Sequence, residues 1–133
     1  MSAAVRIAHV RPTEIRALVV SDGRPEVRTI SSSAEAFAVL VGGRHSFLYL
    51  YGGPGARGLI LVANAEALRT VAKRTASPAG QIARVLGTTV AVGPARLRDG
   101  STAWTSLTDA EVEFWSVALS APARRRRRKE SAR

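Results

Sequence analysis

The chain has 133 residues, of which 46% are hydrophobic and 23% charged, with 20 Lys and Arg against 10 Asp and Glu and no Cys. This length predicts one domain, and it allows a single apolar core that needs no disulfide or metal for stability. The absence of Cys excludes disulfide bonds, thiolate zinc sites, iron–sulfur clusters and cysteine nucleophiles.

The apolar runs are all short, because Arg or a turn residue interrupts each of them before the roughly 20 residues that a membrane-spanning helix needs. We therefore expect no membrane span. Arg6, Arg11 and Arg16 also interrupt the N-terminal stretch in which a secretory signal needs a continuous apolar core, so we predict no export signal. An organelle transit peptide is the alternative for this Arg-bearing start, but its end, at 15–20, has the composition of a strand.

Positive charge is concentrated at the C-terminus. Residues 1–123 contain 13 Lys and Arg and 9 Asp and Glu, whereas residues 124–133 contain 7 and 1. The basic run repels itself and has no apolar residue to bury, which is typical of a disordered segment. We predict an N-terminal arm at 1–14, a globular domain at 15–120 and a disordered Arg-rich tail at 121–133.

The first half of the domain predicts two hairpins with a helix between them. β-Branched and alternating apolar residues indicate strands at 15–20, 26–30, 47–51 and 59–63. Asp22-Gly23 joins the first two strands and the Gly-rich run 52–58 joins the others. Ser32 and Glu35 have the spacing of a helix capping box, and Gly42-Gly43 supplies a left-handed stop.

The second half predicts helices at 65–74 and 79–86, a strand at 88–92 closed by Gly93-Pro94, and one further strand within 95–106. Thr108 and Glu111 have the spacing of a second capping box, which opens a last helix. Together these elements predict an α+β fold with a single mixed or mostly antiparallel sheet of about five strands and about three or four short helices.

The order of these elements, and the turn and capping residues at their ends, give the chain a family resemblance over about residues 15–119. It rests on Ala17-Leu18-Val19-Val20, Val41-Gly42-Gly43, Asn64, Ser77-Pro78-Ala79, the strand from Leu86-Gly87 to Val92-Gly93, and Leu107-Thr108-Asp109-Ala110-Glu111. In these features the chain resembles the uncharacterised family called domain of unknown function 3846. The resemblance implies a cytoplasmic accessory protein carried by a bacterial phage, plasmid or integrated element. It implies no activity.

The basic tail predicts docking on nucleic acid, DNA or RNA, without sequence specificity. Its cations are Arg124, Arg125, Arg126, Arg127, Arg128 and Lys129. Guanidinium groups that neutralise phosphates release counterions, which gives affinity without base readout. Arg69, Lys73 and Arg74 lie in one predicted helix and would add a basic face, for which a solvated helix surface is the alternative. For the tail, the alternatives are a membrane surface or another acidic partner, or a solubilising segment.

Two features of the second hairpin have alternative interpretations. Tyr49 and Tyr51 lie two positions apart and so on one face of a strand, which suits either base stacking or ordinary sheet packing. The Gly-rich run 52–58 could form an anion nest, but it lacks the Gly-Lys-Ser/Thr of a phosphate-binding P-loop. A flexible connection is the favoured interpretation, and an arm that carries Arg57 to a partner is the alternative.

We predict no catalytic, cofactor-binding or metal-binding residue. His9 and His45 have no second ligand at metal-site spacing, so surface or packing roles are expected. The carboxylates within 109–113 are explained by helix capping, and so is the run Ser31-Ser32-Ser33. We therefore expect a non-enzymatic protein without a cofactor. A protein-binding modulator of host machinery and a small-molecule-binding domain or enzyme are the alternatives.

Overall fold

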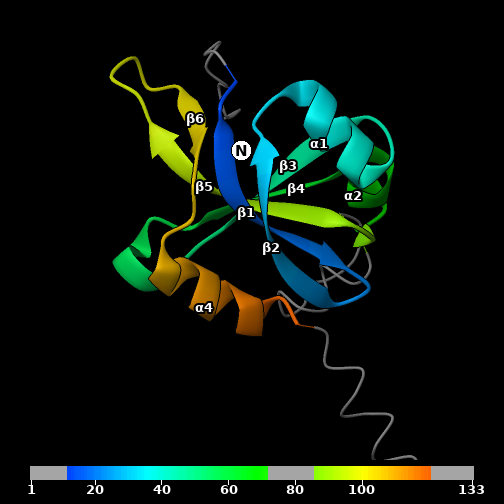
Figure 1. Ribbon diagram of the computed structural model, residues 1–133. Helices are drawn as coiled ribbons and strands as arrows, with labels where there is room; N and C mark the ends of the chain where they lie inside the picture. Colours follow the sequence, from blue (N-terminus) through cyan, green and yellow to red (C-terminus); the bar gives the residue numbers. More distant parts are fainter. Residues whose placement is uncertain (1–11, 72–85, 121–133) are drawn as a thin grey trace, which may run out of the picture.

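The computed structural model describes residues 12–71 and 86–120 (Figure 1). The elements in chain order are β1 (Glu14–Ser21), β2 (Arg24–Ser31), α1 (Ala34–Val41), β3 (His45–Leu50), a 3-10 turn η1 (Pro54–Ala56), β4 (Leu59–Asn64), α2 (Ala65–Val71), β5 (Thr89–Arg96), β6 (Thr102–Thr105) and α4 (Asp109–Ala118). The four strands predicted for the first half of the domain are therefore confirmed, with small shifts at their ends.

All six strands form one antiparallel sheet. Five of them lie in the order β2-β1-β5-β4-β3, and β6 pairs with the outer end of β5, where 93–96 lie opposite 102–105. Strand β5 is distant in sequence from both hairpins, yet it inserts between β1 and β4 and joins them into one sheet. The predicted α+β class with a single sheet is confirmed, with six strands in place of about five.

Helices cover both faces of this sheet, with α1 and α4 on opposite sides (Figure 1). Neighbouring residues in the central strands point to opposite faces, so each strand contributes to two cores. Leu18 of β1 belongs to the core that includes Trp115 of α4, whereas the adjacent Val19 belongs to the core that includes Phe37 of α1. Burial on both faces explains why the central strands are nearly continuous apolar runs.

Turn residues lie where the backbone requires them. Asp22 and Gly23 have positive φ angles of 55° and 76°, as a tight two-residue hairpin turn requires. Gly42 ends α1 in the left-handed conformation, with a φ of 80°. Asn64 ends β4, and its Oδ1 accepts hydrogen bonds from two backbone N–H groups of α2 at 3.0 and 3.2 Å. The chain thus changes from strand to helix at one side chain.

The two predicted capping boxes have different outcomes. At α4, Thr108 Oγ1 accepts from Glu111 N at 3.1 Å and Glu111 Oε1 accepts from Thr108 N at 2.9 Å, so this box is confirmed. At α1 the N-cap is Ser33, whose Oγ accepts from the backbone N–H three residues later at 3.1 Å. The box predicted to begin at Ser32 is wrong, because Ser32 still pairs with the preceding chain through the carbonyl of Thr13.

Strand β5 runs past Gly93-Pro94, where its end was predicted. It continues to Arg96 because β6 provides a partner there, with Pro94 opposite Trp104. Pro94 lies beyond Val92, the last residue of β5 that pairs with β4, so its missing N–H costs no bond to that strand. The further strand expected within 95–106 is β6.

Several predictions concern segments that the structure does not describe. The helix expected at 65–74 is confirmed over Ala65–Val71, and its remainder lies outside the described residues. The same is true of 1–11 in the predicted arm, of 79–85 in the next predicted helix and of the tail at 121–133. Strand β1 begins at Glu14, the last residue of the predicted arm.

Candidate functional site

Arg69 is the predicted nucleic-acid contact that falls within the described residues. It stands on α2, where its Nη2 lies 2.5 Å from Oε2 of Glu66, three positions earlier. The two side chains are 63% and 76% exposed, so this ion pair adds little stability and can exchange with other ions. Lys73, Arg74 and the tail cations at 124–129 lie outside the described residues.

The net positive charge of the chain lies outside the described part of the fold. Residues 12–71 and 86–120 contain eight Arg, no Lys and nine Asp or Glu. Residues 1–11, 72–85 and 121–133 contain twelve Lys or Arg and a single Glu. The described fold is therefore close to neutral, and the excess positive charge of the chain lies in the other three segments.

The carboxylates at the start of α4 hold the helix in place. Asp109 Oδ1 lies 2.7 Å from Nη2 of Arg16, a β1 residue. Arg16 also donates from Nε and Nη2 to the carbonyl of Leu107, at 3.2 and 2.9 Å. Glu111 completes the capping box described above. The structural explanation of Asp109 and Glu111, as residues that complement and cap the helix N-terminus, is confirmed.

The Gly-rich connection between β3 and β4 is tied to α4 by its Arg. Nε and Nη2 of Arg57 lie 2.5 and 2.6 Å from the two carboxylate oxygens of Glu111. The same guanidinium donates to the carbonyls of Pro94 and Ser106, at 3.2 and 3.0 Å. A free arm that carries Arg57 to a partner is therefore wrong, because this side chain is already bonded to three other parts of the fold.

The Arg57–Glu111 pair is partly shielded from water. The Glu111 side chain is 3% exposed and that of Arg57 is 33% exposed. The hydrogen bond from Arg57 lowers the pKa of Glu111 against the opposing effect of burial, and hydrogen bonds from Thr108 lower it further. Because its oxygens already accept from Arg57 and Thr108, Glu111 is a structural anion and not an available general base.

Tyr49 and Tyr51 lie next to each other, as their spacing predicts, but they have different surroundings. Tyr49 is half-buried and its hydroxyl donates to the carbonyl of Arg57, whereas Tyr51 is 86% exposed. Their ring centroids are 4.7 Å apart and the ring planes meet at 80°. Because the rings are nearly perpendicular, they do not form a common platform for successive bases, and Tyr51 is the more exposed of the two.

His45 has the packing role that was expected. Its ring contacts Phe37 and Phe47 edge to face, with centroid distances of 5.7 and 5.4 Å, and burial lowers its pKa. His9 lies outside the described residues. Within the described ranges, no three metal-ligating side chains lie together. The hydroxyls of Ser31, Ser32 and Ser33 all accept hydrogen bonds from backbone N–H groups.

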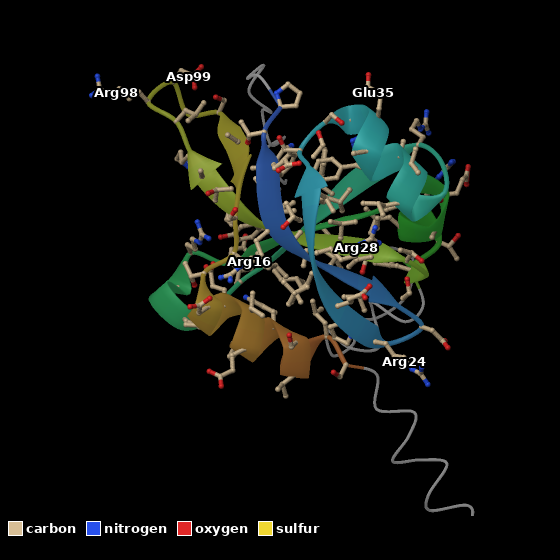
Figure 2. The ribbon with its side chains drawn as sticks, viewed as in Figure 1. Arg16, Arg24, Arg28, Glu35, Arg98 and Asp99 are labelled. Carbon is tan, nitrogen blue, oxygen red and sulfur yellow. The ribbon has the colours of Figure 1, made fainter. Side chains whose placement is uncertain are left out.

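A shallow groove of about 450 Å³ lies between β2 and α1. Its lining includes the apolar residues Ile30, Ala36, Val39 and Leu40, together with Arg28 and Glu35. Figure 2 shows Arg28 on β2 and Glu35 on α1. Small-molecule sites usually combine an enclosed apolar wall with several converging polar groups, which this open groove lacks. Sequence patterns did not predict the groove, because it arises where a helix packs beside an edge strand.

Comparisons of the chain with protein-family models, with curated proteins and with solved structures found no match. The likeness to domain of unknown function 3846 therefore stays a prediction. Among the described residues, no helix is both long and apolar enough to cross a membrane.

Proposed function

We propose that this protein docks on the phosphate backbone of DNA or RNA, without sequence specificity, through its basic residues at 124–129. The observation that supports this proposal is the separation of charge along the chain. The described fold has nine carboxylates against eight Arg, whereas the segment 124–129 consists entirely of cations. A polyanion is therefore attracted most strongly to this segment.

The strength of this attraction is set by counterion release. If the six cations at 124–129 neutralise about six phosphates of duplex DNA, log K falls against log salt with a slope of about −5. Affinity then drops by about three decades between roughly 50 and 200 mM salt. Such binding positions the protein on nucleic acid without reading its sequence.

Arg69, Lys73 and Arg74 form a second, weaker contact in this proposal. Arg69 can leave Glu66 for a phosphate at little cost, because both members of this exposed pair are already solvated. An accessory role in a bacterial phage or mobile element is part of the proposal and rests on the family resemblance alone.

Fluorescence anisotropy with labelled duplex DNA, single-stranded DNA and RNA tests the proposal at three salt concentrations. We expect the full chain to bind with the steep slope given above. A full-length variant with Gln at all of 124–129 should lose this binding, whereas a variant with Lys at 124–128 keeps the charge and should retain it. A chain with Arg69→Gln, Lys73→Gln and Arg74→Gln should bind with a slope reduced by about 1 to 3.

Circular dichroism of each variant checks that the fold is intact. The proposal fails if the full chain does not bind at about 100 mM salt, where six phosphate contacts still give measurable affinity. It fails equally if the Gln variant binds as tightly as the wild type. Capture of a protein partner by that Gln variant would then support the alternative of a protein-binding modulator.

A further inference from the structure

Among the residues that the structure describes, the outer edge of β2 is an unpaired strand edge. β2 is the last strand in the sheet order, and β1 alone pairs with it among the described strands. Ser21 and Arg24 flank the two-residue turn, so they form a hydrogen-bonded pair, and every second residue of β2 from Arg24 bonds to β1. The residues between them, including Val27 and Thr29, direct their N–H and C=O groups to the open edge.

The contacts of β1 support this assignment. Arg16 lies opposite Thr29, and its N–H donates to Ser106 Oγ at 2.9 Å while its C=O accepts from Leu107 N at 2.9 Å. Both groups of Arg16 therefore point away from β2, as in a non-hydrogen-bonded pair. The backbone of Thr29 consequently faces away from β1 as well.

The side chains along β2 are complementary to a second copy of the same strand. Val27 is 48% exposed, and the exposed residues Glu26 and Arg28 flank it. Neither charge has an ion-pair partner among the residues that the structure describes. If two β2 strands run antiparallel with Val27 opposite Val27, Glu26 of each copy lies directly opposite Arg28 of the other. Cross-strand pairs of opposite charge stabilise such a pairing.

The groove between β2 and α1 fits the same register. Arg24 of one copy then lies opposite Ile30 of the other, on the face of the sheet that α1 covers. Ile30 of β2 and Glu35 of α1 both line the groove, and Figure 2 shows Glu35 on α1. The aliphatic part of Arg24 can follow the apolar lining while its guanidinium reaches Glu35. Each groove would thus receive one Arg from the other copy.

We propose that two copies of this chain associate through antiparallel pairing of their β2 edges, with Val27 at the two-fold axis. Charges and Pro on an edge strand can also prevent association. Here the charges alternate in sign around Val27, so they attract in this register. In this register Pro25 of one copy lies opposite Thr29 of the other copy. The carbonyl of Pro25 can still accept a hydrogen bond from the N–H of that Thr29. This association is independent of the proposed nucleic-acid docking.

Sedimentation velocity of the full chain tests the proposal, in low salt and from about 1 to about 300 μM, because small interfaces give weak affinities. We expect a reversible monomer–dimer equilibrium in this range. Glu26→Arg places Arg opposite Arg28, and Arg28→Glu places Glu opposite Glu26, twice in each dimer. Each variant alone should lose about tenfold or more in dimer affinity.

The decisive sample is the mixture of these two variants. In the mixed pair every Arg again faces a Glu, so a heterodimer should form with an affinity within about threefold of the wild type. A separate variant, Glu35→Lys, removes the proposed contact with Arg24 of the other copy and should weaken the wild-type dimer. Glu113→Arg in α4 and Arg96→Glu in β5 make the same charge changes at exposed positions outside the β2 edge and should leave association unchanged.

A wild-type chain that stays monomeric over the whole range would overturn the proposal, whether or not its edge captures an unrelated extended peptide. So would variants at Glu26 and Arg28 that dimerise as well as the wild type, or a mixture that gains nothing over its components. Circular dichroism distinguishes these results from misfolding, and both substituted side chains are exposed in the monomer.

Discussion

Arg57 and Glu111 are 54 positions apart in the chain and form a two-pronged ion pair, with N···O distances of 2.5 and 2.6 Å. Glu111 simultaneously caps α4 through Thr108, so one carboxylate joins the β3–β4 connection to the start of the last helix. The geometry of bidentate Arg–carboxylate pairs is specific, and this pair therefore fixes the position of the loop as well as adding stability.

Arg57→Ala should destabilise the fold, because it leaves the nearly buried Glu111 without its cation. We expect the free energy of unfolding to fall by about 3 kcal/mol, as measured by urea denaturation. Arg69→Ala is the matched control, since it removes an exposed Arg–Glu pair of similar length. The control should change the free energy by less than about 0.5 kcal/mol. Equal losses in the two variants would contradict the importance of burial.

The stability of the fold should depend on pH through Glu111. Its pKa is lower in the folded chain, mainly because of the hydrogen bond from Arg57, so the folded state binds fewer protons than the unfolded state. The resulting stabilisation is present above the ordinary Glu pKa of about 4.3 and is lost as the pH falls through the lower folded value. Glu111→Gln lacks this titration.

Urea denaturation of the wild type and of Glu111→Gln across a pH series tests this dependence. The difference in their free energies of unfolding should be greatest near neutral pH and should shrink below about pH 4. A difference that stays constant from neutral to acidic pH would show that Glu111 does not titrate as expected.

Gly93→Ala should displace Arg57. A Cβ atom at Gly93 would come within 2.9 Å of Arg57 Cζ and within 3.1 Å of Thr105 Cγ2, both closer than normal contacts. The substitution should therefore cost more in the wild type than in Arg57→Ala, where the guanidinium is absent. A double-mutant cycle of unfolding free energies should give a coupling of about 1 kcal/mol or more. Additive effects would refute this steric coupling.

Thr89→Val should stabilise the fold. Thr89 is completely buried in β5, and its hydroxyl has no hydrogen-bond partner among the described residues. Val has nearly the same shape without the polar atom, so the free energy of unfolding should rise by about 1 kcal/mol. Thr88→Val is the control, because it removes a hydrogen bond to Ser21 and should bring no gain. Thermal denaturation compares the two.

Local features of the fold could be predicted because neighbouring residues determine them. The turn at Asp22-Gly23 depends on two residues that accept positive φ angles, and the box of Thr108 and Glu111 joins positions three apart. The error at Ser32 has a different origin, because it depends on pairing with another segment of the chain. Three successive Ser can all cap a helix, and the choice of Ser33 depended on how far β2 remained paired.

The uneven charge of the chain could also be read from composition, but the role of Arg57 could not. Gly-rich runs are usually solvent-exposed connections, and Glu111 was already explained by its own helix. No sequence pattern connects two such residues, because their contact requires η1, β5 and α4 to pack at one place. The continuation of β5 beyond Pro94 likewise depended on a partner strand that the chain supplies eight residues later.

The sequence by itself therefore determined most of the helices and strands that the described residues adopt, the turn at Asp22-Gly23, the cap of α4 and the concentration of positive charge in a few segments. These properties depend on residues close together in the chain. Only the tertiary structure decided which strand lies at the edge, which arginine is held internally and which aromatic ring faces solvent. Those outcomes depend on contacts between distant residues, whose free energy is gained only when the whole sheet assembles.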